Sequence, residues 1–136
     1  DFYLYINLFK KPRLFYWYAE NGFWNKSLRR HNLQLQLDWV DLSKIFKKHN
    51  ISIKNCFNFG LKNIAKVMLE HGMITTKLNS DCNNGMMAMV KAWECYSKTS
   101  VNTDIRNNPI MKDIGIYNEF DCKILFDIIT YLRTKV

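Results

Sequence analysis

A tyrosine and an aspartate four positions apart, Tyr117 and Asp121, are the residues of this sequence with the clearest potential for chemistry. On a helix, this spacing places both side chains on one face. Asp121 then shares its face with Leu125, Ile128 and Leu132. Because burying an unpaired charge is costly, the carboxylate needs either a metal ion or a Lys or Arg side chain as a partner. The pattern by itself favours the second alternative, a structural salt bridge.

The elements that would position these residues are mostly helical. The pattern predicts two short strands, at residues 13–19 and at residues 33–37 running on into 39–42. Residues 2–10 are expected to be the end of a helix. Further helices are predicted at residues 20–31, 42–49, 60–71 and 85–97, and a last helical section begins at Asn108-Pro109. Gly115 could split the last section in two. The sequence therefore predicts a helix-rich α/β fold with two short strands and five or six helices, and such a small sheet is expected to gain strands from elsewhere.

Apolar residues at helical spacing indicate which faces are buried. The stripe on the helix predicted at 85–97 consists of Met86, Met89, Val90 and Trp93. We expect the methionines of this helix, Met87 included, to lie in the core. Three other tryptophans could stack on nucleic-acid bases, but core packing is the favoured interpretation for Trp17, Trp24 and Trp39.

Positive charge is concentrated in the first half of the chain. Residues 1–66 hold twelve Lys/Arg and four Asp/Glu residues, a net charge of +8, whereas residues 67–136 hold eight of each. A one-sided basic field favours a polyanionic partner, although a solvated basic surface without a partner is the alternative. The residues that we expect to contact nucleic acid are Lys10, Lys11, Arg13, Arg29, Arg30, Lys54 and Lys62.

Length and composition indicate the number of domains, the compartment and whether a membrane span is expected. The chain has 136 residues, of which 48% are hydrophobic, so we expect a single globular domain over residues 1–136. It opens on Asp1 inside an apolar run, which suggests a piece of something longer. The four cysteines form no CxxC pair, so free thiols in a reducing, intracellular compartment are favoured over a zinc site. No run approaches the roughly 18 apolar residues of a membrane span, and no signal-peptide pattern is present.

The segment YNEFDCKILFDIITYL, which contains Tyr117 and Asp121, resembles the third motif of the DEDDy branch of RNase H-like 3′–5′ exonucleases. More narrowly, it is similar to the end of a predicted RNase H-like nuclease family. Members of that family are often fused to or found beside RecB-type nucleases and helicases, and related forms occur in large DNA viruses. The upstream segments that fit the family are Phe15–Glu20, Val40-Asp41-Leu42, Ser52-Ile53-Lys54, Leu61-Lys62, and Gly85, Ala88, Ala92, Trp93 and Tyr96.

The resemblance implies the helix-rich C-terminal portion of an RNase H-like fold and a metal-dependent hydrolysis of phosphodiesters from a 3′ end. Asp121 and Glu20 would then bind Mg²⁺ or Mn²⁺, and Tyr117 would orient the attacking water. Asp41 would either join the metal ligands or cap the helix that begins at Leu42, and the cap is favoured. Carboxylates suit such a site because these cations prefer oxygen ligands and because two of them stabilise the charge of the transition state.

The sequence departs from the family pattern in two places. The first motif of these nucleases, Asp-x-Glu, does not occur in the 136 residues, and aromatic residues replace the His or Asn that often precedes the second acid. We therefore expect an incomplete metal site and little hydrolysis by this chain alone. A larger nuclease, helicase or polymerase polypeptide is the expected partner. The rival interpretation is a non-catalytic, basic helical module that binds nucleic acid or a partner enzyme. The nuclease interpretation predicts that Glu20 and Asp121 face a common cleft, within roughly 10 Å of each other.

Overall fold

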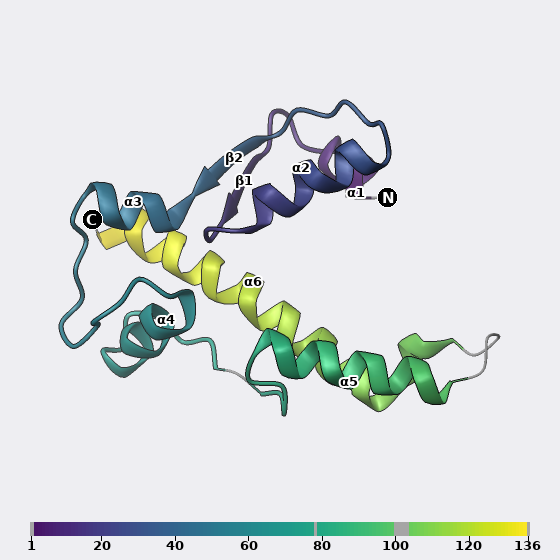
Figure 1. Cartoon of the computed structure of the whole chain (residues 1–136). Coiled ribbons are helices and arrows are strands. Elements are labelled where there is room, and N and C mark those ends of the chain that lie inside the picture. The colour runs from purple at the N-terminus through teal and green to yellow at the C-terminus, as the bar shows by residue number, and fades with distance from the viewer. Residues whose placement is uncertain (1, 78, 100–103, 136) are drawn as a thin grey trace. The chain divides into compact units, whose positions relative to one another are not determined.

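The computed structural model describes residues 2–77, 79–99 and 104–135, which belong to two compact units, Asp1–His71 and Gly72–Val136 (Figure 1). The first unit contains α1 (Phe2–Ile6), β1 (Arg13–Tyr16), α2 (Glu20–Arg30), β2 (Asp38–Asp41), α3 (Leu42–Lys48) and α4 (Leu61–Glu70). The second contains α5 (Gly85–Lys98), a 3₁₀ turn (Ile105–Asn107) and α6 (Pro109–Lys135). Within the described residues, the chain is thus a helix-rich α/β protein with two short strands, as the sequence predicts at this level.

The two strands are parallel and short. Arg13 pairs with Asp38 and Tyr16 with Asp41, and α2 provides the crossover that a parallel pair requires. Both strands are shorter than predicted. The first ends at Tyr16 instead of continuing to residue 19, and residues 33–37 form no strand. A strand needs a hydrogen-bonded neighbour, and β1 begins only at Arg13, after Pro12, which has no N–H to donate. Residues 33–37 therefore have no strand beside them.

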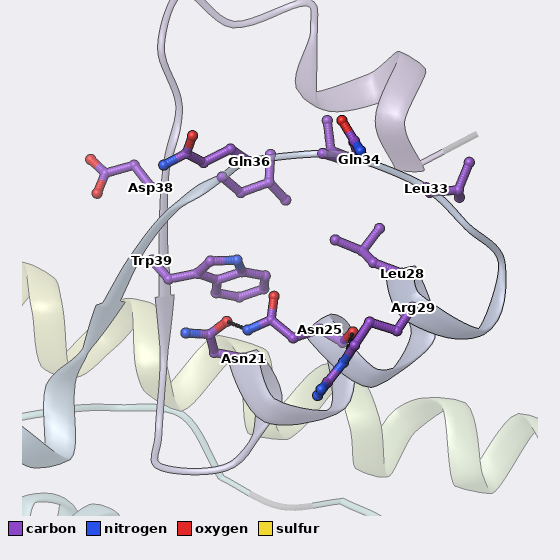
Figure 2. Close-up of a pocket in the computed structure, with 11 residues that line it drawn as sticks. Asn21, Asn25, Leu28, Arg29, Leu33, Gln34, Gln36, Asp38 and Trp39 are labelled. Carbon is purple, nitrogen blue, oxygen red and sulfur yellow. Dashed lines mark hydrogen bonds between the residues drawn. The ribbon is translucent and has the colours of Figure 1, made fainter.

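Residues 33–37 instead line a pocket of about 970 Å³ together with α2 and the start of β2. Figure 2 shows polar side chains of α2 on one side of this pocket, where the Asn25 amide donates a hydrogen bond to Asn21. Trp39 closes one end. Apolar and polar residues of this segment alike line the pocket, so the alternation that suggests a strand here does not separate a buried face from a solvent face.

Aromatic rings form much of the core of the first unit. The Trp39 ring lies 5.6 Å from Tyr16 and 6.2 Å from Trp24, which joins both strands to α2. On the other side of the strands, Trp17 lies 5.3 Å from Phe46 of α3, and both are buried. The expected core packing is therefore confirmed for Trp17, whereas Trp24 and Trp39 pack against other rings but are only half-buried.

The helices of the first unit end where the sequence indicates, with one exception. Gly72 follows α4 with a φ of +66°, the left-handed conformation in which glycine commonly ends a helix. The first helix, however, stops at Ile6 and does not reach residue 10. It gives way to tight turns, in which Leu8 and Phe9 donate to the carbonyls three residues earlier.

The second unit is built on the contact between α5 and the first half of α6 (Figure 1). Its core contains Ala88 of α5, Ile114 and Tyr117 of α6, and Cys82 from the preceding loop. The long helix α6 is continuous from Pro109 to Lys135, so Gly115 does not split it. Asn108 caps it as predicted, accepting a hydrogen bond from the Ile110 N–H.

The prediction that the methionine stripe of α5 lies in the core is wrong. Met86, Met89 and Trp93 expose 72%, 65% and 76% of their surface, and Val90 is also exposed. The helix packs on α6 through its opposite face, where Ala88, Ala92 and Cys95 are small. Small residues let two helices approach closely, so here the contact face is the less hydrophobic of the two by area.

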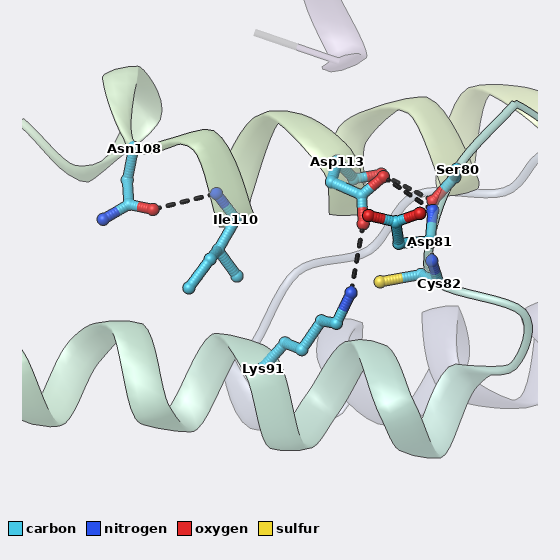
Figure 3. A network of polar contacts seen from close by, with 7 residues as sticks. All are labelled: Ser80, Asp81, Cys82, Lys91, Asn108, Ile110 and Asp113. Carbon is cyan, nitrogen blue, oxygen red and sulfur yellow. Dashed lines mark hydrogen bonds and ion pairs between the residues drawn. The ribbon is translucent and has the colours of Figure 1, made fainter.

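A polar cluster ties the loop before α5 to α6 (Figure 3). The Asp113 carboxylate accepts a hydrogen bond from the Asp81 N–H and lies 3.3 Å from the Lys91 ammonium. The Ser80 hydroxyl donates to the Asp113 main-chain carbonyl. The nearby Ser80 hydroxyl, the Asp81 N–H, the Cys82 thiol and the Lys91 ammonium outweigh partial burial, which would raise the pKa of the Asp113 carboxyl group, and hold that pKa at about 2.

Because this pKa lies below the ordinary aspartate value, ionised Asp113 stabilises the folded state above pH 4, and the contribution is lost as the pH falls toward 2. Asp113→Asn should lower the melting temperature of the chain at neutral pH. The difference from the wild type should disappear as the pH falls through the range between 3.8 and about 2. Circular dichroism melts over this range test the prediction. Asp81→Asn is the control, and an equal or larger loss in that variant would contradict the role of Asp113.

Candidate carboxylate site at the strand ends

Two of the predicted site residues lie together at the carboxyl end of the parallel strands. Glu20 is the first residue of α2, four positions after β1 ends, and Asp41 is the last residue of β2. Tyr16 and Asp41 are register partners, so the chain leaves both strands side by side. In sheets with parallel strands, ligands commonly bind beyond these carboxyl ends. The fold thus brings together two acids that are 21 positions apart in the sequence.

The turn between β1 and α2 connects the two carboxylates. Glu20 Oε2 accepts hydrogen bonds from the N–H groups of Trp17 and Ala19, at 3.2 and 3.3 Å. Asp41 Oδ1 accepts a hydrogen bond from the Tyr18 N–H, the group between them, at 3.3 Å. Successive N–H groups of one turn are therefore shared between the two acids, which fixes both side chains at this edge.

Each carboxylate also has a local structural role. The residue before α2, Ala19, has no side-chain acceptor, and Glu20 instead reaches back to N–H groups of the turn that precedes the helix. Asp41 caps α3 by accepting from the N–H groups of Ser43 and Lys44 and from the Ser43 hydroxyl. The favoured interpretation of Asp41 as a helix cap is confirmed.

These roles occupy one oxygen of each acid. In the described part of the chain, no hydrogen bond reaches Glu20 Oε1 or Asp41 Oδ2. The pair therefore offers two carboxylate oxygens, a donor type that suits Mg²⁺ and Mn²⁺. Over the same described residues, no group of three or more His, Cys, Asp or Glu side chains is arranged to hold a metal. A site of the two-metal type thus needs further ligands beside this pair.

Asp41 is held in its ionised form. Burial would raise the pKa of its carboxyl group, but the Ser43 hydroxyl and the N–H groups of Lys44, Tyr18 and Ser43 outweigh that effect. The pKa consequently lies below the ordinary value. A carboxylate that stays charged while 91% of its residue surface is covered, since only 9% is exposed, is suited to binding a cation.

Tyr18 has an unusual backbone conformation at this edge. Its φ of +79° lies in the left-handed region, which bulky residues rarely adopt and which costs of order 1–3 kcal/mol. The conformation lets its N–H reach Asp41 while its ring points into solvent, 75% exposed. Strain of this kind, beside two acids, is a reason to look for function at this turn.

Tyr117 and Asp121 lie on one face of α6, as their spacing predicts. The same stripe contains the buried residues Ile114, Ile124 and Ile128. Tyr117 is itself buried, in the core of the second unit with Cys82 and Ala88, and Asp121 is half-buried. Because these residues and Glu20 belong to different units, a common cleft for Glu20 and Asp121 stays a prediction, as does the role of Tyr117 toward a water molecule.

The predicted nucleic-acid contacts all belong to the first unit. Those that are exposed are Lys10, Lys11, Arg13, Arg29, Arg30 and Lys54. Lys62, on α4, is half-buried. The Arg13 guanidinium is engaged with Asp38 at 2.8 Å, so it is the least available of the exposed group for a phosphate. Their contact with nucleic acid remains a prediction.

Sequence reasoning missed two features of this edge. The hydroxyl of Ser43, 2.6 Å from Asp41 Oδ1, is signalled by the Asp-x-Ser spacing of a helix cap. The strained turn at Tyr18 has no recognisable signal, because Tyr is a poor candidate for a positive φ.

Comparison with protein-family models, with curated proteins and with solved structures gave no match to this chain. None of the helices in the described ranges combines the length and the apolar character of a membrane span.

Proposed function

We propose that this chain carries part of the metal site of a nuclease that hydrolyses phosphodiesters of DNA or RNA from a 3′ end. The observation that carries the proposal is the pairing of Glu20 and Asp41 at the carboxyl end of the two parallel strands. Each acid uses one oxygen for the fold and keeps the other without a hydrogen bond from the described residues. The resemblance of the Tyr117–Asp121 segment to the third motif of RNase H-like exonucleases supplies the reaction class.

The site residues would have different roles in the proposed metal site. Glu20 and Asp41 would hold divalent cations at the strand ends, Asp121 would add a third carboxylate, and Tyr117 would orient the water. When bound, Mg²⁺ or Mn²⁺ stabilises negative charge on the attacking, non-bridging and leaving oxygens. The N–H groups of Trp17, Tyr18 and Ala19 keep the first two carboxylates in place before any cation arrives. An acid equivalent to the first motif is needed in addition for full activity.

Terbium luminescence tests the cation site directly. Tb³⁺ is a hard cation that prefers oxygen ligands and emits when a nearby aromatic ring absorbs light, and Trp17 and Tyr18 adjoin the two carboxylates. We expect Tb³⁺ to give sensitised emission that Mg²⁺ and Mn²⁺ displace. Glu20→Gln should weaken the binding roughly tenfold or more, because ligand charge sets the affinity of such sites.

Glu70→Gln is the matched control, since Glu70 is an exposed glutamate of the same unit. It should leave the Tb³⁺ titration unchanged. Equal titrations for the wild type and Glu20→Gln would contradict the proposed metal site.

A second candidate function is the non-catalytic module that binds nucleic acid or a partner enzyme. The observation that favours it is the charge of the first unit, in which twelve Lys/Arg residues stand against five Asp/Glu residues, a net charge of +7 over residues 1–71. This candidate predicts salt-dependent binding of nucleic acid without any site for a divalent cation.

A further inference from the structure

Three aromatic side chains of the first unit are exposed around one groove. Phe57 exposes 95% of its surface, Tyr18 75% and Phe59 41%. They line a groove of about 590 Å³ together with Lys47 and Ser43. We call Tyr18, Phe57, Phe59 and Lys47 the aromatic cradle. Exposed aromatic rings from two distant segments of the chain, gathered at one groove, indicate a binding surface.

The cradle is held in place by hydrogen bonds. The Trp17 indole N–H donates to the Phe59 carbonyl oxygen at 2.9 Å. Asn58 Oδ1 accepts from the Gly60 N–H and from the Asn63 amide, at 2.9 and 2.7 Å. A Cβ added to Gly60 would lie 3.1 Å from this Asn58 oxygen, so the turn is closely packed. The rings are therefore presented by an ordered turn, which lowers the entropy lost when a ligand binds.

The charged residue among those that line the groove is Lys47, which favours an anionic group of the ligand at that point. The Lys47 ammonium lies 6.0 Å from the centre of the Tyr18 ring, within reach of a cation–π interaction. Lys44 and Lys48 are also exposed on α3, although they do not line the groove. Flat apolar rings beside ammonium groups complement the bases and phosphates of a single strand, whose base faces are open to stacking.

The cradle adjoins the carboxylate pair. Ser43 lines the groove, and its hydroxyl donates to Asp41 Oδ1. Tyr18 contributes its ring to the groove and its N–H to the same oxygen. A ligand in the groove would thus lie next to the strand ends.

We propose that the aromatic cradle binds unpaired nucleotides of a single-stranded nucleic acid, with bases stacked on Tyr18, Phe57 and Phe59 and a phosphate at Lys47. The substrate of the site would accordingly be a single strand or a frayed end instead of an intact duplex. The delivery of the strand to Glu20 and Asp41 rests on the proposed function, whereas the stacking itself needs no metal.

Fluorescence anisotropy with a 5′-fluorescein-labelled oligothymidylate, at low salt and with EDTA, tests the proposal on the whole chain. Phe57→Ala and Tyr18→Gly should each lower the affinity by roughly five- to a hundredfold, the size of one base–aromatic stacking contact. Phe57→Trp should restore it. Tyr18→Gly also removes the strained φ, so loss of folding is not expected to explain its effect.

The matched control is Phe23→Ala. Phe23 is an exposed aromatic residue of α2 in the same unit, and Lys26 lies 5.8 Å from its ring, but it is not among the residues that line the groove. It should bind like the wild type. A blunt duplex probe should show no difference between the wild type and Phe57→Ala, since its bases are not free to stack on a protein ring.

Three results would contradict the binding of unpaired nucleotides by the aromatic cradle. They are no binding of the single strand by the wild type, unchanged affinity in both cradle variants, or an equal loss of affinity for duplex and single strand in those variants. The first of these would leave the rings as a surface for another protein. The proposed metal site is tested independently by the Tb³⁺ titration, which Phe57→Ala should leave unchanged and Glu20→Gln should weaken.

Discussion

Raising the salt concentration should weaken the binding of this chain to single-stranded nucleic acid steeply. The side chains at Lys10, Lys11, Arg29 and Arg30 are exposed and available for phosphates. If they neutralise about four phosphates, the affinity should fall roughly 50-fold between about 50 and about 200 mM salt, because each contact releases condensed counterions. Titrations of one labelled oligonucleotide at several salt concentrations measure this slope. Oligonucleotides of different sequence should give the same slope, because phosphate contacts carry no sequence information.

Charge-reversal variants test which residues cause the salt dependence of binding. Changing Lys10, Lys11, Arg29 and Arg30 to Glu should weaken binding to all sequences alike and flatten the salt dependence. The control is the reversal of Lys98 and Lys112, two exposed lysines of the second unit. An affinity that stays flat from low to high salt, or an equal loss in the control, would remove the electrostatic basis for nucleic-acid binding at the first unit.

Local signals predict most of the helices correctly. The helix at residues 60–71 has Ile64, Ala65 and Met68 on its buried face and ends before Gly72, and all of this is visible in the sequence. Asp41 and Asn108 likewise act as the helix caps that their positions predict. Such features depend on residues within one or two turns of each other, so a single sequence contains them.

Features that depend on distant partners are predicted less well. The stripe of Met86, Met89 and Trp93 is the more apolar face of α5, yet α6 packs against the face with Ala88 and Ala92. The choice of face depends on which surface of α6 fits, and periodicity carries no information about that. Residues 33–37 alternate as a strand does, but β1 is too short to pair with them.

The same distinction between local signals and distant partners applies to the candidate site. That Glu20 and Asp41 lie at neighbouring strand ends could be predicted only through family resemblance, because 21 residues separate them. The aromatic cradle was not predicted at all. Phe57 and Phe59 belong to a segment without periodicity, and Tyr18 is part of an aromatic run that indicates a buried strand.

The proposed nuclease site requires Glu20 and Asp121 to bind the same ions, and paramagnetic NMR tests this requirement with a large expected effect. Mn²⁺ broadens amide signals by an amount that falls steeply with distance. A small proportion of Mn²⁺ added to the ¹⁵N-labelled chain should therefore affect only the segments around the ion. If Glu20, Asp41 and Asp121 share a two-metal site, the signals at Trp17–Glu20 and those around Asp121 should lose most of their intensity together.

A single substitution makes this measurement decisive. Glu20→Gln should remove the broadening from both segments, because the shared ions lose a charged ligand. Glu70→Gln should change neither segment. A shared site therefore predicts a joint loss of broadening. Broadening around Asp121 that persists in Glu20→Gln, or that never accompanies broadening at Trp17–Glu20, would contradict it and would leave Tyr117 and Asp121 as a structural pair of α6.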